Sequence, residues 1–255
     1  MMFMFGKKKE LGIVEILYRN LKLLRSINKA RKEKEMVYSI AHTSNNFTYQ
    51  DARIASVFAL YQQRYPERRL ERLIGYLLKD MERLNFEKTS SIPQKFEPQY
   101  TKYQSRYDKL KTINLLSHTV RVFLISLEIN KNVPDRFAEQ VSLLALVHDF
   151  GKSQKVFDFV GESNNEKHNH TSAKYLNAVM DSMNEYSNDF IASMCDAIYF
   201  HHSANADMKP EDVIENEFIR MLNQCDRTAR EQELRAINRQ KLPQNMLEIE
   251  DKESR

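Results

Sequence analysis

Histidine and aspartate residues that could bind a metal are concentrated in the second half of this sequence. Six of the seven histidines lie between residues 118 and 202, and only His42 lies outside. Most of the six fall on apolar helix stripes, where burying an imidazole without a partner is costly. A metal centre explains why they would converge, because neutral imidazole and carboxylate suit Mn, Fe, Ni, Co or Zn.

The surroundings of these residues strengthen the metal hypothesis. His118 shares a helix face with apolar residues three positions before it and four after it. His148 and Asp149 end the apolar run VSLLALVHDF, which we expect to be buried on every side. His201 and Asp226 follow apolar residues on their own helix faces. Four separate helices would therefore supply the ligands.

Helical periodicity runs through most of the chain. Apolar residues recur at steps of three or four residues in segments near 8–36, 49–63, 67–85, 101–130, 135–150, 169–184, 187–202 and 211–238. No period-two alternation persists long enough to build a sheet. Five glycines and six prolines leave few places for tight turns. The sequence predicts an all-α protein.

A change in composition predicts a domain boundary. Residues 86–100 (FEKTSSIPQKFEPQY) have the Ser, Thr and Pro content of a linker. We therefore predict a basic helical region over 1–100 that includes this linker, and a second helical domain over 101–240. The polar residues 241–255 form a tail that we expect to fray.

Charge is distributed unevenly between the two halves. Residues 1–112 carry 23 Lys and Arg against 12 Asp and Glu, whereas residues 113–255 carry 16 against 23. The basic half is either a surface for nucleic acid or an acidic membrane, or a solvated face without a partner. The basic helix over 8–36 likewise either lies on a membrane or packs on its own domain.

Several classes of protein are excluded by what the chain lacks. Cys195 and Cys225 have no CxxC spacing, which argues against a disulfide framework or a zinc finger and favours a reducing cytoplasm. No segment has the roughly 18 apolar residues that a transmembrane helix needs, so we expect a soluble protein. The chain contains no P-loop and no dinucleotide-binding fingerprint.

A set of short motifs resembles a known family. LSHTV, HDFGK, a histidine before SAKYL, FHH and QCD follow one another in this order. This H…HD…H…H…D pattern resembles the HD-domain superfamily of metal-dependent phosphohydrolases over about residues 110–235. HD followed by xGK, with flanking ligands at helical intervals, is more specific than an HD dipeptide alone. The resemblance implies an HD-domain helical bundle preceded by the smaller basic helical domain.

The resemblance also implies a metal-binding set. Four residues match the family's ligands for a first metal ion: His118, His148, Asp149 and Asp226. Asp149 matches the carboxylate that bridges two ions when a second is present. Histidines beyond this minimal set favour two divalent transition metal ions.

For the ligands of a second ion the sequence leaves alternatives open. His201 is one candidate, and His202 is either another or points to solvent. The family's third histidine lies five residues before a small alanine, as His168 does before Ala173. Helical phase favours His170 instead, so both histidines remain candidates.

The resemblance places Lys152, the lysine of HDFGK, near the substrate phosphate. With Asp149 it forms the expected catalytic pair, acting with a metal-activated water that attacks phosphorus. Arg227 and Arg230 would either contact the phosphate or pair with glutamates on the helix surface.

The resemblance favours a phosphomonoesterase or phosphodiesterase that acts on a nucleotide or another phosphoester. The HH pair is similar to that of the HD-GYP cyclic-di-GMP phosphodiesterases, but the chain continues SANADMKPED where they have GYP. One alternative is a DNA-processing relaxase or nuclease similar to the MobH type, which the basic first half would suit. Others are a di-iron HD-type oxygenase, since the same ligands would serve it, and a ligand sensor without activity.

Overall fold

The computed structural model describes residues 46–93, 107–161, 166–202 and 216–240, together with residue 40 and eight positions between 18 and 35. The chain divides into two compact units, Met1–Ser39 and Ile40–Arg255. In the first unit the described residues are helical, and Tyr18, Leu21 and Leu24 are exposed. The rest of the helix expected over 8–36 lies outside the described residues.

The second unit contains the helices of interest here. The α-helices are α2 (Ala52–Arg64), α3 (Glu71–Arg83), α4 (Tyr107–Leu110), α5 (Leu115–Ile129), α6 (Asp135–Val147), α7 (Gln154–Val160), α8 (His168–Met183), α9 (Asn188–Phe200) and α10 (Glu217–Gln240). Short 3₁₀ helices are η1 (Phe86–Lys88), η3 (Asn130–Asn132) and η4 (Phe150–Lys152). The described residues form no strand, only one isolated bridge between Ser90 and Asn114. The prediction of an all-α protein is confirmed.

Helix α6 lies at the centre of this unit because its second half, VSLLALV, is apolar on nearly every side. Every residue from Val141 to Val147 is buried. α5 packs along α6, and α10 packs against both. α8 and α9 pair with each other, and α9 also contacts α6. The carboxyl ends of α6 and α9 therefore approach the first turn of α5 and the middle of α10, where His118 and Asp226 lie.

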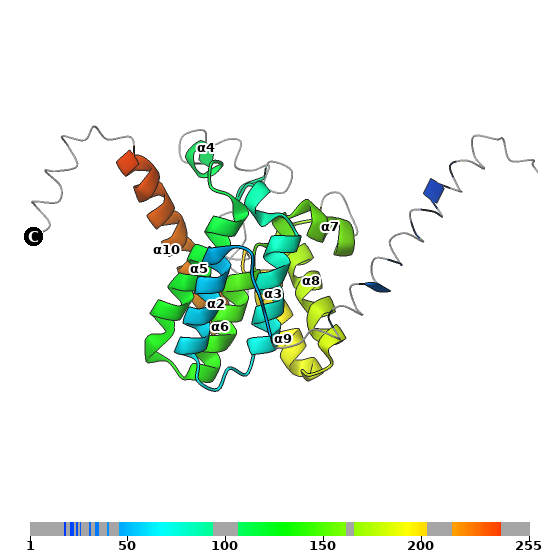
Figure 1. Ribbon diagram of the computed structural model, residues 1–255, viewed down its shortest axis with the longest axis horizontal. Helices are drawn as coiled ribbons and strands as arrows, with labels where there is room; N and C mark the ends of the chain where they lie inside the picture. Colours follow the sequence, from blue (N-terminus) through cyan, green and yellow to red (C-terminus); the bar gives the residue numbers. More distant parts are fainter. Residues whose placement is uncertain are drawn as a thin grey trace, which may run out of the picture. The chain divides into compact units, whose positions relative to one another are not determined.

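Helices α2 and α3 cover α5 and α6 from one side, as Figure 1 shows. The apolar face of α3 is buried, including Leu73, Ile74 and Leu77. The Tyr61 hydroxyl of α2 donates a hydrogen bond to the buried carboxylate of Glu139 on α6, at 2.5 Å. α2 and α3 thus form part of the same core as α5 and α6.

The single helical segment expected near 101–130 is broken. α4 ends at Leu110 and α5 begins at Leu115. The Asn114 side chain accepts a hydrogen bond from the backbone N–H of Ser117 at 2.7 Å, so Asn114 starts a new helix. Helix α7 was not expected from periodicity, since its seven residues are too few for a clear pattern.

The expected linker over 86–100 is described only as far as residue 93. Phe86 and Ile92 are buried, and residues 86–93 pack within the unit that contains the helices on both sides. The division at 86–100 stays a prediction, and the tail over 241–255 lies outside the described residues.

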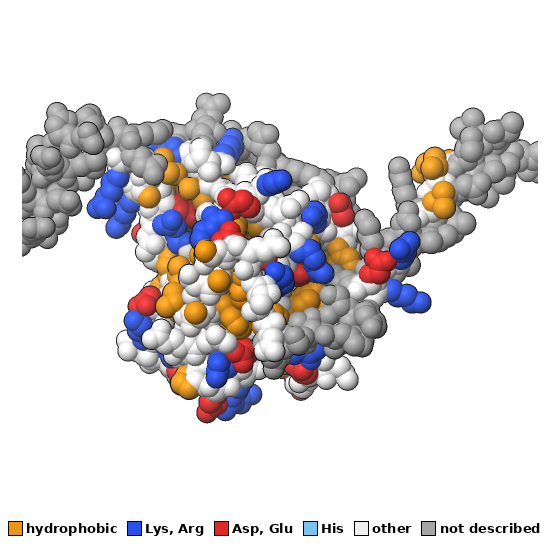
Figure 2. Space-filling view, in the orientation of Figure 1, with side chains coloured by type: hydrophobic (Ala, Val, Ile, Leu, Met, Phe, Trp, Pro, Cys, Tyr) orange, Lys and Arg blue, Asp and Glu red, His pale blue; other side chains and the backbone are white. Residues whose placement is uncertain are grey.

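The surface of this unit carries mixed charge on the face shown in Figure 2, where basic and acidic side chains are interspersed. Among the described residues, no helix is both long enough and apolar enough to cross a membrane.

Candidate metal centre

Two groups of potential metal ligands lie between the helices. The first contains His118 of α5, His148 at the end of α6 and Asp226 of α10. The second contains His168 at the start of α8 with His201 and His202 at the end of α9. Within each group, one ligand atom per residue lies within 4.8 Å of the others. The structure thus brings together side chains that are far apart in the sequence.

Asp149 lies between the two groups and directs one carboxylate oxygen to each. Its Oδ2 is 3.4 Å from the Nε2 atoms of both His118 and His148. Its Oδ1 is 3.4 Å from His168 Nε2. A carboxylate in this position can bind one metal ion with each oxygen, which is the geometry of a bridging ligand.

The imidazoles of the site are oriented by their Nδ1 atoms. His148 Nδ1 lies 2.9 Å from the Ala145 carbonyl oxygen, and His201 Nδ1 lies 2.6 Å from that of Ile198. A carbonyl can only accept, so Nδ1 of both rings carries the proton and Nε2 keeps its lone pair. The lone pairs face the site, as metal ligation requires.

Five buried polar atoms around Asp149 make no hydrogen bond within the described part of the chain. They are the Nε2 atoms of His118, His148 and His201, Oδ2 of Asp149 and Oδ1 of Asp226. Leaving a buried polar atom unsatisfied costs about 1–3 kcal/mol, more for a charged group. Cations bound at the two groups would be partners for all five atoms, of which Asp149 Oδ2 also forms an ion pair with Lys152. This donor set therefore fits divalent transition metal ions.

Protonation in the second group suits a metal as well. Burial lowers the pKa of His168 and His201 well below the usual value, which keeps both imidazoles neutral. Burial and the charge of Lys152 lower the pKa of His202 to about 4. The Nε2 atoms of His168 and His202 are 3.0 Å apart. Two neutral rings at this distance can share one proton or bind one cation.

The first group is more strongly charged. Burial and the charge of Arg230 oppose protonation of His118, but the surrounding carboxylates outweigh both and raise its pKa to about 9. Although burial opposes it, the neighbouring His148 and the Lys152 ammonium hold the pKa of the Asp149 carboxyl well below its usual range. The pKa of Asp226 is also lowered, against the effect of burial, by His118 and Arg230. A metal ion would replace the proton on His118 as the partner of these carboxylates.

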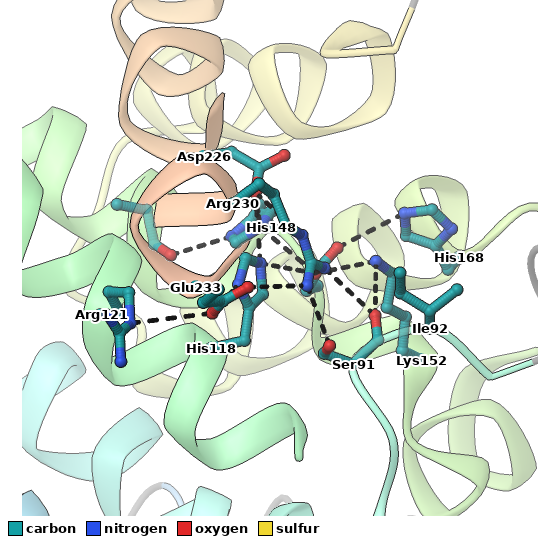
Figure 3. A network of polar contacts seen from close by, with 12 residues as sticks. Ser91, Ile92, His118, Arg121, His148, Lys152, His168, Asp226, Arg230 and Glu233 are labelled. Carbon is teal, nitrogen blue, oxygen red and sulfur yellow. Dashed lines mark hydrogen bonds and ion pairs between the residues drawn. The ribbon is translucent and has the colours of Figure 1, made fainter. Parts of the chain in front are cut away.

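Lys152 and Arg230 both lie beside Asp149, and Figure 3 shows the two basic side chains next to Ser91. Lys152 Nζ is 2.9 Å from Asp149 Oδ2, although the side chain is only 4% exposed. Arg230 Nη2 lies 3.8 Å from the same oxygen. Both cations also donate to the carbonyl oxygen of Ser91, at 3.1 and 3.2 Å. Two basic side chains therefore converge next to the candidate metal ligands.

The structure separates His168 from His170. Two residues along a helix correspond to a rotation of about 200°, so the two rings point to different sides of α8. The His170 ring stacks on Tyr199, with ring centroids 3.9 Å apart and planes 8° apart. His170 belongs to neither ligand group, and the Arg227 side chain is exposed.

Ser91 was not identified from the sequence, and Glu233 was expected only as a helix-surface partner of Arg227 or Arg230. Glu233 contacts His118 and Arg230, and a signal for it existed, because it follows Asp226 by seven residues on the same helix face. The sequence gives no such signal for Ser91, because this residue lies in an irregular segment and is 139 positions away from Arg230, which it contacts.

Comparison with known protein families identifies the larger part of this unit. Residues 115–237 match the family model of the HD domain. The two ligand groups, Asp149, Lys152 and Arg230 all lie within this range. Comparisons with curated proteins and with solved structures found no match. The match assigns residues 115–237 to the HD domain, the domain that defines a superfamily of metal-dependent phosphohydrolases.

Proposed function

We propose that the chain hydrolyses a phosphoester, in a nucleotide or a related phosphorylated molecule, with two divalent transition metal ions. The observation that supports this most strongly is the position of Asp149. Its two oxygens face two separate histidine groups, with Oδ2 3.4 Å from His118 Nε2 and Oδ1 3.4 Å from His168 Nε2. Metal ions bound there would supply an activated water and positive charge for attack on phosphorus.

The candidate ligands would be divided between the two ions. His118, His148 and Asp226 would bind one ion, and His168, His201 and His202 the other, with Asp149 shared. As metal ligands these histidines would be neutral, so they would add no charge of their own to the ions. A phosphate needs cationic groups beside the ions to bind and to offset developing charge.

Lys152 and Arg230 are the groups that would meet the phosphate. Both lie beside Asp149, and the Arg230 guanidinium presents a planar fork that matches two phosphate oxygens. Lys152 Nζ lies 2.9 Å from Asp149 Oδ2. If Asp149 held the ions, the Lys152 ammonium beside it would be placed to bind a substrate oxygen.

The test is metal analysis combined with phosphoester hydrolysis. Protein purified without chelators is assayed for bound transition metals and for cleavage of bis(p-nitrophenyl) phosphate and p-nitrophenyl phosphate under argon. We expect about two ions per chain and hydrolysis with Mn, Ni or Co. Asp149→Ala should lose both, whereas Asp196→Asn, a change at an exposed residue of α9, should lose neither.

Two results would contradict the proposal. One is wild-type protein that contains no bound transition metal, and the other is an Asp149→Ala variant that retains its metal. A di-iron oxygenase remains the second candidate, because four histidines and two aspartates of this set match its ligand count. Activity that requires iron and O₂, with no hydrolysis under argon, would favour the oxygenase.

A further inference from the structure

Glu233 is a buried carboxylate that the proposed reaction does not use. It lies on α10, seven residues after Asp226, and is 1% exposed. Seven residues correspond to about two helical turns, so both side chains leave the same face of α10. A carboxylate is very costly to bury unless it is paired and hydrogen-bonded. The partners of Glu233 therefore indicate why it is there.

The partners of Glu233 connect it to the candidate metal site. Its Oε1 accepts from His118 Nδ1 at 2.9 Å, and its Oε2 is 3.1 Å from Arg230 Nη1. Arg121 Nε lies 3.8 Å from Oε1. Burial opposes ionisation, but the contact with His118 outweighs it and lowers the pKa of Glu233. Glu233 is thus a charged acceptor on the side of His118 that faces away from Asp149.

The acceptor at Nδ1 of His118 is of a different kind from those of His148 and His201. His148 and His201 hold their Nδ1 protons with main-chain carbonyls three residues earlier. His118 lies within α5, where the corresponding carbonyl belongs to the helix ladder, so its Nδ1 needs an acceptor from another element. The acceptor is a carboxylate, whose charge makes the imidazole a stronger ligand as well as orienting it.

We propose that Glu233 is a positioning residue that directs the Nε2 lone pair of His118 to the first metal ion. This inference rests on the proposed metal centre. The contact with Arg230 extends the role of Glu233, because the same carboxylate holds the guanidinium beside Asp149. Glu233 thereby links the metal ligand to the group that would bind the phosphate.

The first readout is metal affinity, measured by competition with a chromophoric chelator for Zn²⁺ and Mn²⁺. Substitutions of partners outside the ligand set typically weaken metal binding by roughly 10- to 100-fold. We expect Glu233→Gln to weaken metal binding by roughly 10-fold, since its amide oxygen still accepts a hydrogen bond from His118 Nδ1. Glu233→Leu has no acceptor and should weaken metal binding by roughly 100-fold. Glu231→Gln, a matched change at an exposed residue of the same helix, should leave the affinity unchanged.

The second readout is the ¹⁵N NMR signature of the His118 ring in the metal-free protein at high pH, assigned with His118→Ala. Wild-type protein and Glu233→Gln should keep the proton on Nδ1, whereas Glu233→Leu should lose this preference. Thermal unfolding establishes that each variant is folded.

Two failures can be told apart. A folded Glu233→Leu variant with wild-type metal affinity and an unchanged His118 signature overturns the role of Glu233. Wild-type protein that binds no metal contradicts the proposed function instead, and the ring signature still tests the contact between His118 and Glu233.

Discussion

Gly151 packs directly against the first turn of α8, which carries His168. A Cβ atom at position 151 would lie 2.0 Å from the carbonyl oxygen of His168 and 2.9 Å from the backbone nitrogen of Ser172. The Gly151 N–H also donates to Ser172 Oγ at 2.8 Å. The glycine of HDFGK is therefore what allows the two ligand groups to approach each other.

Substitution of this glycine should affect the second metal ion. In Gly151→Ala the backbone of α8 must move, because the opposing atoms belong to the main chain. Overpacking of this kind costs about 1–3 kcal/mol. We expect one bound ion per chain instead of two. In Gly161→Ala a Cβ would lie 2.5 Å from the Phe157 carbonyl oxygen, so this control introduces comparable strain away from the site. Loss of metal from both variants would show only a general effect of strain.

The pair His168 and His170 offers a direct test of the ligand assignment. We expect His168→Ala to lower the metal content from two ions to one, measured by elemental analysis after gel filtration. His170→Ala should retain both ions and lose only the stack on Tyr199, which is worth about 0.5–1.5 kcal/mol. Equal metal loss in the two variants would contradict the assignment.

Arg230 and Arg227 form a matched pair on α10. Arg230 is half-buried and lies 3.8 Å from Asp149, whereas Arg227 is exposed. A hydrogen bond to a charged group contributes about 1.5–3 kcal/mol. We therefore expect Arg230→Gln to lower kcat/KM for a phosphoester by roughly 10- to 100-fold, with metal content retained. Arg227→Gln should leave kcat/KM unchanged; a similar loss in both variants would point to a diffuse electrostatic effect.

Metal removal should destabilise the fold. Without an ion, the Nε2 atoms of His148 and His201 make no hydrogen bond with the described residues, and Asp149 and Asp226 both lie against the single imidazole of His118. A ligand at 100 times its Kd stabilises the folded state by about 2.7 kcal/mol. We expect the Tm of the wild-type protein to fall on treatment with a chelator and to recover with Mn²⁺ or Zn²⁺. The Tm of Asp149→Asn should not respond to either treatment, and a wild-type Tm that is equally insensitive would argue against a metal centre.

Asp80 predicts a pH effect on stability away from the metal site. This carboxyl is 2% exposed, accepts from the Tyr175 hydroxyl and pairs with Arg83 at 2.5 Å. Burial outweighs these partners and raises the pKa of Asp80 to about 6 from its ordinary value of 3.8. Folding therefore takes up a proton between about pH 4 and 6, and the contribution of Asp80 to stability falls as pH rises through this window.

The measurement is the difference in unfolding free energy between the wild-type protein and Asp80→Asn, at several pH values. One pKa unit corresponds to about 1.4 kcal/mol, so this difference should fall by up to about 3 kcal/mol from pH 4 to 7. Above that range it should be constant. Asp181→Asn, at an exposed position on α8, should show no such trend. A difference that rises with pH would contradict the buried, protonated state of Asp80.

Helical periodicity and residue type were sufficient to predict much of this protein. The all-α fold followed from apolar residues at helical spacing, because that spacing depends only on the local chain. His118, His148 and Asp226 could be selected from the sequence, since polar residues on apolar stripes require partners. The structure brings these three residues together. The break before α5 and the short helix α7 were missed, because capping contacts and seven-residue helices leave little periodic signal.

Only the tertiary structure decided the relations between side chains. The rotation of α8 separates His168 from His170, and the approach of two histidine groups gives Asp149 a different neighbour on each oxygen. The contacts of Glu233 with His118 and of Arg230 with Ser91 join positions more than 100 residues apart. Such contacts depend on how helices pack and turn against one another. The sequence alone therefore determined which residues must find a partner, and the packing of the helices determined which partner each one meets.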